Sequence, residues 1–174
     1  GRLSTAPGSG LHLLCHCDSC VRAQRHFGVP ATRSEGVGIF QTTPDRLRID
    51  TGAGHLALAT LSPKGLFRWY AKCCDTQLCA TARTGRFPFV GLLTTTLADA
   101  APLGPARCEA FLPAPGGKVV HKGSLRLVSG LARRTIPALI SGRWRDTAFF
   151  DPTTGAPTAA LTLLPKDAGL PIPN

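Results

Sequence analysis

The sequence predicts a folded, mainly β protein, and three observations favour this prediction. Glycine (19 residues) and proline (15) make up about a fifth of the 174 residues and are spread along the chain, which disfavours long helices. Hydrophobic residues reach 43%, enough to form a core. Short apolar runs recur between turns that contain Gly or Pro. We therefore expect a single domain over residues 1–174, built of short strands with one or two short helices.

The expected strands are apolar runs that end at turn residues. They cover residues 11–14, 37–42, 47–50, 56–61, 66–71, 87–93, 106–112 and 159–164. Residues 62–65 read Ser-Pro-Lys-Gly, which is typical of a type I or II turn. The strands on either side of this turn are therefore expected to pair as a hairpin.

Two segments have helical character. Residues 18–27 are expected to form a short helix, with Asp18 or Ser19 as the N-cap and Gly28 after its end. Between residues 125 and 140, aliphatic side chains recur at roughly helical spacing. Pro137 is expected to kink or split this second segment. Its expected basic face consists of Arg126, Arg133, Arg134, Arg143 and Arg145.

The chain is strongly basic. Lys and Arg number 20 against 10 Asp and Glu, which gives a net charge of +10. Such a charge favours anionic partners: phosphates, carboxylate-bearing small molecules or nucleic acid. No apolar run approaches the roughly 20 residues that span a bilayer, and no basic segment followed by a short apolar run suggests an export signal. We expect a cytoplasmic protein with no membrane partner.

The strongest chemical signal is the sequence CHCDSC, in which Cys15, Cys17 and Cys20 fall within six residues. Thiolate is a soft ligand that suits zinc, and a loop can bring three such ligands to one cation. Three ligands from one place leave the fourth position to substrate or water, as in a catalytic metal site. The alternatives are an inert cluster of buried thiols, or a structural site whose fourth ligand lies elsewhere in the chain.

A second cysteine-rich stretch, RWYAKCCDTQLC, follows the expected hairpin. Its cysteines are Cys73, Cys74 and Cys79. Adjacent cysteines seldom both bind one ion, so one of the first two is expected to face a metal while the other packs, and Cys79 is a further candidate. Cys108 is expected to be a small buried hydrophobic residue.

With these two motifs the chain resembles the glutathione-dependent formaldehyde-activating enzyme family. Members of that family carry a central C-x-C-x-x-C and, further along, an R-x-F-C-x-x-C-G-x-x-L stretch. Here the first motif is Cys15, Cys17 and Cys20, and the second begins at Arg68 and includes Cys74. The resemblance covers roughly residues 10–92, and the wording CHCDSC with RWYAKCC suggests a separate branch. It implies a β-tent fold of twisted antiparallel sheets, zinc, and carbon–sulfur lyase or thiol-adduct chemistry on a small thiol such as glutathione.

Two departures from the family pattern concern a second, structural zinc site. Ala71 stands where the first cysteine of C-x-x-C is expected, although Cys73 can take its place. The C-x-C-G that supplies the other ligands is absent, and the chain begins as if cut just after such a motif. Cys73 and Cys74 are therefore the expected ligands of an incomplete second site, whereas the three-cysteine site is intact.

Basic side chains near the cysteines are candidates for neutralising the site and binding the carboxylates of a glutathione-like substrate. They are Arg22, Arg25, Arg68, Lys72 and His26. For each cation the alternative is an ordinary solvated charge, and for His26 it is a histidine favoured by the helix C-terminus. The ring of His16 is expected to point away from a metal held by its two neighbours. The sequence identifies no catalytic residue.

Other classes lack their motifs. No G-x-x-x-x-G-K-[ST], G-x-G-x-x-G, G-x-S-x-G or H-E-x-x-H stretch is present. The runner-up is a non-enzymatic zinc module that binds an anionic partner such as nucleic acid, with the arginines of residues 126–145 following a phosphate backbone. The absence of two separated cysteine pairs and an aromatic content of 6% disfavour nucleic acid.

Overall fold

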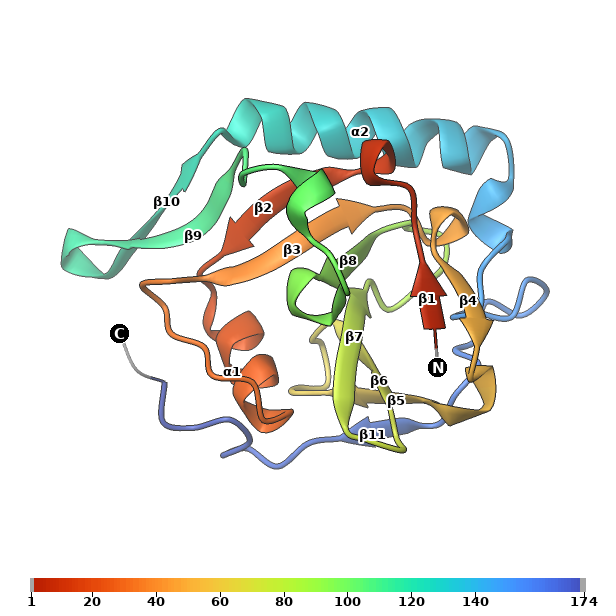
Figure 1. Ribbon diagram of the computed structural model, residues 1–174, viewed down its shortest axis with the longest axis horizontal. Helices are drawn as coiled ribbons and strands as arrows, with labels where there is room; N and C mark the ends of the chain where they lie inside the picture. The colour runs from red at the N-terminus through yellow and green to blue at the C-terminus, as the bar shows by residue number, and fades with distance from the viewer. Residues whose placement is uncertain (1, 173–174) are drawn as a thin grey trace.

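The structure, a computed structural model, describes residues 2–172 and is mainly β, as the sequence predicts (Figure 1). In chain order its strands and α-helices are β1 (Arg2–Ser4), β2 (Leu11–Cys15), α1 (Asp18–His26), β3 (Val37–Thr42), β4 (Arg48–Thr51), β5 (Leu56–Thr60), β6 (Phe67–Ala71), β7 (Thr76–Thr81), β8 (Val90–Leu93), β9 (Glu109–Ala114), β10 (Lys118–Lys122), α2 (Ser124–Ile140) and β11 (Leu161–Leu163). Neither α-helix of the described residues is long and apolar enough to cross a membrane.

Nine strands form one mixed sheet in the order β10-β9-β2-β3-β8-β7-β6-β5-β11, and β1 pairs with β4 in a small second sheet. Most neighbours are antiparallel, but β2 pairs with β9 and β5 pairs with β11 in parallel. The sheet is therefore not purely antiparallel. The sheet thus joins strands that are far apart in the sequence. One of them, β9, lies beside the cysteine trio because its Ala110 is opposite Cys15.

The strand predictions hold best where turn residues mark the ends. The strand expected at 37–42 is β3, and the expected hairpin is formed by antiparallel β5 and β6 around a turn in which the Gly65 N–H donates to the Ser62 carbonyl at 3.0 Å. Strands β1, β7 and β10 were not expected. β1 has three residues and all five side chains of β10 are exposed, so neither leaves a clear apolar pattern.

Both helices differ from expectation in detail. The N-cap of α1 is Cys17, not Asp18 or Ser19, and no side chain caps the helix. α2 has 17 residues, so it is not short, and Pro137 does not split it. Pro137 lies near the helix end, where both the N–H and the hydroxyl of Ser141 donate to its carbonyl and close the last turn.

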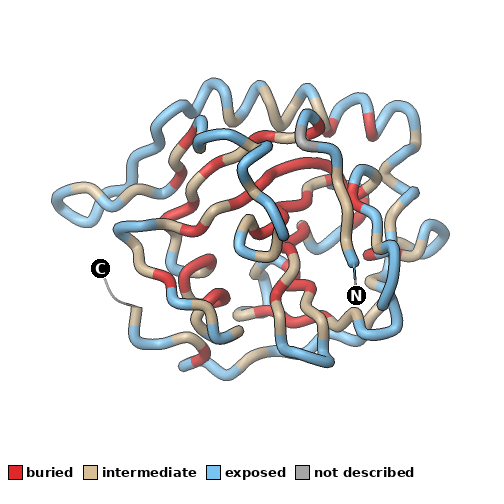
Figure 2. The backbone as a smooth tube through the Cα atoms, viewed as in Figure 1, coloured by how far each residue is buried: buried red, intermediate tan, exposed pale blue. Residues whose placement is uncertain are grey.

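Buried residues lie along the strands of the sheet (Figure 2), and their apolar side chains form two groups. One surrounds Trp69 and includes Phe40, Leu58 and Cys79. The other surrounds the start of α1 and includes Cys15, Cys20, Val21 and, as expected, Cys108. The cysteine trio therefore lies within packed structure and not on a surface loop.

Candidate metal centre

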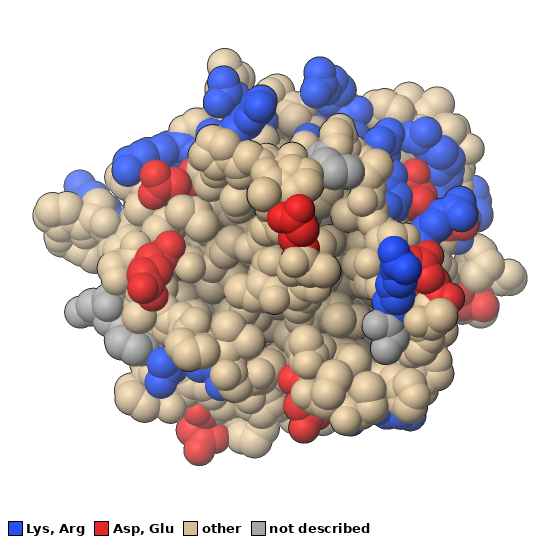
Figure 3. Space-filling view, viewed as in Figure 1, with Lys and Arg blue, Asp and Glu red and all other residues tan. Residues whose placement is uncertain are grey.

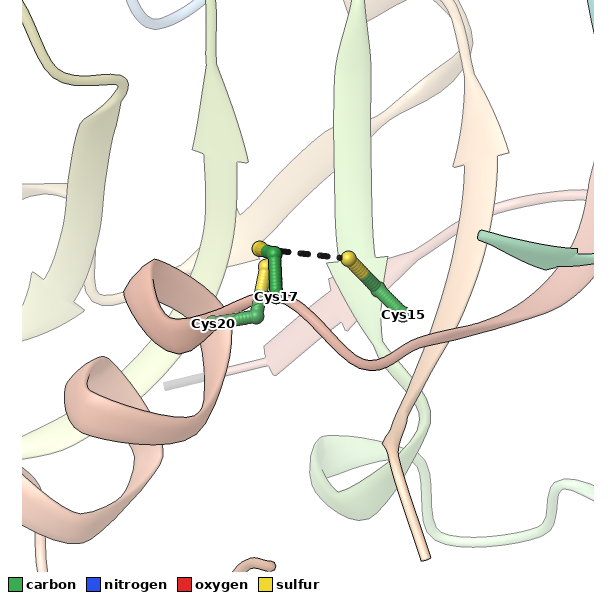
Figure 4. A group of neighbouring side chains, drawn as sticks. All are labelled: Cys15, Cys17 and Cys20. Atoms are coloured by element: carbon green, nitrogen blue, oxygen red, sulfur yellow. Dashed lines mark hydrogen bonds between the residues drawn. The ribbon is translucent and has the colours of Figure 1, made fainter. Parts of the chain in front are cut away.

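Cys15, Cys17 and Cys20 bring their three sulfur atoms together at the junction of β2 and α1 (Figure 4). All three Sγ atoms lie within 4.8 Å of one another, and Cys15 and Cys17 are 3.4 Å apart. Sulfurs bound at about 2.3 Å to one tetrahedral zinc ion would be roughly 3.8 Å apart. The spacing therefore suits one metal ion, and these three cysteines can hold one.

The local backbone produces this convergence. β2 ends at Cys15, where its parallel pairing with β9 is continued by the His16 N–H, which donates to the Ala110 carbonyl at 2.9 Å. Cys17 is the N-cap of α1, and its carbonyl accepts the N–H of Cys20 at 3.0 Å. One helical turn thus places Cys20 beside Cys17. The helix N-terminus also favours negative charge on these sulfurs.

Arg68 supplies a buried positive charge to the trio. It lies on β6, is only 2% exposed, and places Nη1 and Nη2 at 3.9 and 4.0 Å from the Cys20 Sγ. Nη2 also donates to the Ser19 hydroxyl at 2.8 Å and to the Ser19 carbonyl at 3.2 Å. Among the described residues, no carboxylate forms an ion pair with it. A buried cation needs a compensating anion, so the contact favours a thiolate at Cys20.

The three thiols differ in acidity. The pKa of Cys20 lies well below its usual value because hydrogen bonds from Cys15 and Cys17, and then the charge of Arg68, stabilise its thiolate. The pKa of Cys15 is raised, first by its hydrogen bonds with Cys17 and Cys20 and then by burial. For Cys17 the hydrogen bond with Cys15 lowers the pKa, but the hydrogen bond with Cys20 and burial outweigh it and raise the pKa to about 11. Without metal, this arrangement favours the thiolate at Cys20 and keeps the protons on Cys15 and Cys17.

A pocket of about 290 Å³ reaches the trio through Cys17. Its wall includes Arg33 from the loop after α1, together with Phe111 and Lys118 from the β9–β10 hairpin. Arg33 also pairs with Asp18, the first residue of α1. The trio is thus buried on the side of the core but accessible from this pocket, whose wall holds Lys118 and the paired charges of Arg33 and Asp18.

His16 lies between two of the cysteines, and its ring points away from them, as expected. The imidazole is buried: Nδ1 is 2.6 Å from the Arg33 carbonyl oxygen and Nε2 is 3.4 Å from the Glu109 carboxylate. Gly36 packs against the ring so closely that a Cβ there would lie 2.8 Å from Cε1. His16 therefore ties the loop that carries Arg33 to β9, on both sides of the pocket.

Four of the basic side chains expected to bind substrate lie elsewhere. Arg22 donates to the carbonyls of Ala168 and Lys166 and anchors the C-terminal segment. The Nε of Arg25 is buried without a hydrogen-bond partner. Lys72 is exposed in the turn after β6, and exposed His26 lines a different pocket, beside Phe27. None of these four, nor Arg68, lines the pocket at Cys17. Their role in substrate binding stays a prediction.

The second cysteine group does not join the trio. Cys73 and Cys74 lie in the exposed turn between β6 and β7, with their sulfurs 3.8 Å apart, and Cys79 is buried in the Trp69 core group. Within residues 2–172, no third metal-ligand side chain converges on the Cys73–Cys74 pair. The pKa of Cys74 is lowered by the Thr76 hydroxyl, which donates to its sulfur at 3.2 Å, and then by Cys73. A metal role for this pair stays a prediction.

Sequence reasoning did not identify Arg33, Glu109, Phe111 or Lys118. The last three lie in the β9–β10 hairpin, far from the trio in the chain.

The backbone of this hairpin is unusual beside the pocket, because Phe111 has a φ of +60°. Bulky residues rarely adopt this conformation. The Phe111 N–H donates to His121 Nδ1 at 3.2 Å, which holds the hairpin in this shape beside the pocket.

Comparison with known proteins assigns the chain to a family but not to an activity. No curated protein and no solved structure matches it. Residues 1–118 match a family described as "Family of unknown function (DUF6151)". This range includes the cysteine trio, Arg68, and the hairpin residues Glu109, Phe111 and Lys118. It covers more than half of the chain, which therefore belongs to the DUF6151 family of unknown function.

Proposed function

We propose that Cys15, Cys17 and Cys20 bind a zinc ion and that the protein binds a small thiol, such as glutathione or its adduct, beside it. The observation that carries the proposal is that a pocket lined by Arg33 and Lys118, with Asp18 as its one carboxylate among the described residues, meets the trio at Cys17. The resemblance of both cysteine motifs to the formaldehyde-activating enzymes favours carbon–sulfur lyase or thiol-adduct chemistry at this position.

The donor set favours zinc. Three thiolates with no imidazole or carboxylate ligand form a soft site, and zinc accepts sulfur ligands in tetrahedral geometry. Three thiolates around a divalent ion leave one excess negative charge. The buried guanidinium of Arg68 beside Cys20 compensates this charge, which otherwise would disfavour a further thiolate.

The residues of the chain have distinct roles in this proposal. When bound, zinc would supply a fourth position at which a substrate thiol is held as its thiolate. Arg33 and Lys118 receive the carboxylates of that substrate and orient it in the pocket. The contacts of His16 with the Arg33 carbonyl and with Glu109 fix the spacing of the two pocket walls. Phe111 contributes an apolar surface that restricts water.

Cobalt substitution tests the proposal, because Co²⁺ bound by thiolates has visible bands that respond to each ligand. Glutathione should change the ligand-field bands of the cobalt protein, whereas S-methylglutathione, which lacks the free thiol, should leave them unchanged. Identical spectra with both compounds would contradict thiol binding at the metal.

A second experiment, nucleic-acid binding, distinguishes this proposal from the alternative that the protein is a zinc module for an anionic macromolecule. If glutathione leaves the cobalt bands unchanged while the zinc protein binds single-stranded nucleic acid tightly and with strong salt dependence, the module is correct. The thiol proposal instead expects weak nucleic-acid binding that is unaffected by glutathione.

A further inference from the structure

The outer face of α2 carries a continuous stripe of exposed aliphatic side chains. Leu125 and Ile140, near its two ends, are 83% and 84% exposed. Val128, Ile136 and Leu139 between them are exposed as well. Large apolar side chains at this exposure usually scatter over a surface, whereas a contiguous patch marks an interaction site.

Helical spacing explains why the stripe is continuous. Leu125, Val128, Ala132, Ile136 and Leu139 follow one another by three or four residues, so they line one face of the helix. The buried face, which includes Thr135 and Ala138, lies beside the stripe, about a quarter turn around the helix. α2 runs along the edge of the molecule (Figure 1), and the stripe occupies one part of its exposed surface.

The stripe lies in a strongly cationic segment. Residues 118–145 contain seven Lys and Arg and no Asp or Glu. Figure 3 shows Lys and Arg gathered along the edge formed by α2. Two of the expected basic residues have partners within the protein: Arg134 donates a hydrogen bond to the Gln41 side chain, and Arg143, although exposed, forms an ion pair with Asp45. Arg126 and Arg133 remain exposed, and at 100° per residue both lie on the same side of the stripe, roughly 110° around the helix from its centre.

The end of the helix adds an aromatic anchor. Trp144 follows α2 and is half-buried, and the guanidinium of Arg145 lies 4.4 Å from the centroid of its ring. Tryptophan and arginine are favoured at the boundary between water and lipid, where an amphipathic side chain satisfies both phases.

We propose that the outer face of α2 docks on an anionic phospholipid bilayer, with the aliphatic stripe in the headgroup boundary and Arg126 and Arg133 at the lipid phosphates. Such a helix lies in the plane of the surface. A second copy of the chain is a poorer occupant, since each copy carries +10 and would bring its cations together. Nucleic acid would satisfy the cations but leave the aliphatic stripe without an apolar partner. The expectation of no membrane partner rested on spanning segments and does not address this surface contact.

Vesicle sedimentation with the full chain tests the proposal. Vesicles of phosphatidylcholine and phosphatidylserine in roughly equal amounts should bind the protein, and pure phosphatidylcholine vesicles should bind it at least about tenfold less. The double substitution Val128→Gln with Ile136→Gln should reduce binding about tenfold or more. Leu163→Gln, which removes an exposed aliphatic side chain on β11, is the matched control and should bind as the parent does.

A second variant reverses the charge of two exposed arginines and leaves the aliphatic side chains of the helix unchanged. Arg126→Glu with Arg133→Glu should abolish binding to the anionic vesicles, whereas Lys64→Glu, in the exposed turn between β5 and β6, should bind nearly as the parent does. Because Trp69 is fully buried, a blue shift of tryptophan emission on adding vesicles would come from Trp144.

Three results would overturn the proposal. One is equal binding to neutral and anionic vesicles by the parent and by all variants. Another is a concentration-dependent dimer, measured by sedimentation velocity, that the Val128→Gln and Ile136→Gln pair removes while vesicles bind no protein. The third is tight nucleic-acid binding lost only in the charge-reversed pair, again without vesicle binding.

Discussion

The guanidinium of Arg68 lies 3.9 Å from the sulfur of Cys20, and both side chains are buried. β6 thus contributes a positive charge to a site whose sulfur atoms all come from the β2–α1 junction. Burying a charge without a partner costs several kcal/mol, so this pairing favours a negative sulfur. It connects the two motifs that the sequence presents separately.

Replacing Arg68 with methionine should weaken metal binding about 10- to 100-fold, because the cation that offsets the thiolate charge is lost while similar volume is retained. Competition with a chromophoric zinc chelator measures the change. Arg48→Met removes an exposed arginine from β4 and should leave affinity unaltered. Equal affinities for the two variants would show that Arg68 has no electrostatic role at the site.

Serine at Cys15, Cys17 or Cys20 should each lower zinc affinity by more than about 100-fold, because a thiolate ligand is lost from a three-ligand site. Cys108→Ser is the control: it alters a buried thiol close in space to the same core group but outside the trio. Circular dichroism checks that each variant is folded. Retention of stoichiometric zinc by any one of the three trio variants would contradict the ligand set.

Zinc binding at neutral pH should release about two protons per ion, since Cys15 and Cys17 have raised pKa values while Cys20 is already ionised. Affinity should therefore increase with pH, and the dependence should weaken as pH approaches the Cys17 pKa of about 11. Calorimetry in buffers of different ionisation enthalpy counts these protons. Release of three protons would mean that Arg68 does not hold Cys20 as a thiolate.

Gly36→Ala should destabilise the fold by about 1–2 kcal/mol more than Gly28→Ala. Both glycines have positive φ, +71° and +76°, so both substitutions carry the same backbone strain. At Gly36 alone, the new Cβ would meet the His16 ring at 2.8 Å, whereas nothing lies within 4 Å at Gly28. Urea denaturation compares the two, and equal losses would argue against close packing of His16.

Alanine at Arg33 or Lys118 should weaken glutathione binding about three- to tenfold each, as expected for a partly exposed cation facing a carboxylate. Lys72→Ala, on the β6–β7 turn, should leave binding unaffected. Titration of the cobalt protein reports both affinities. If Lys72→Ala weakens glutathione binding and the two pocket variants do not, the substrate lies beside Lys72, as the sequence analysis expected, and not in the Cys17 pocket.

The trio could be predicted from sequence because its spacing is local. C-x-C-x-x-C places all three ligands on one bend, and the order of β2, the bend and α1 follows from nearby residues. The hairpin of β5 and β6 was predictable for the same reason, since a Ser-Pro-Lys-Gly turn lies between two apolar runs.

The pocket could not be predicted, because its walls depend on pairing between distant segments. Lys118 and Phe111 reach Cys17 only because β9 joins β2 in parallel, and local sequence patterns do not specify that pairing. Arg68 was identified as a nearby cation, but its burial against Cys20 depends on how β6 packs against α1. The continuity of α2 through Pro137 likewise depends on its position near the helix end.

The most direct test of the metal centre is X-ray absorption at the zinc edge, with elemental analysis, on the full chain purified without added chelator. The account predicts one zinc ion per chain with three sulfur neighbours at about 2.3 Å and a fourth, lighter neighbour that glutathione replaces with sulfur. Absence of bound metal, or a shell of nitrogen and oxygen atoms alone, would contradict it.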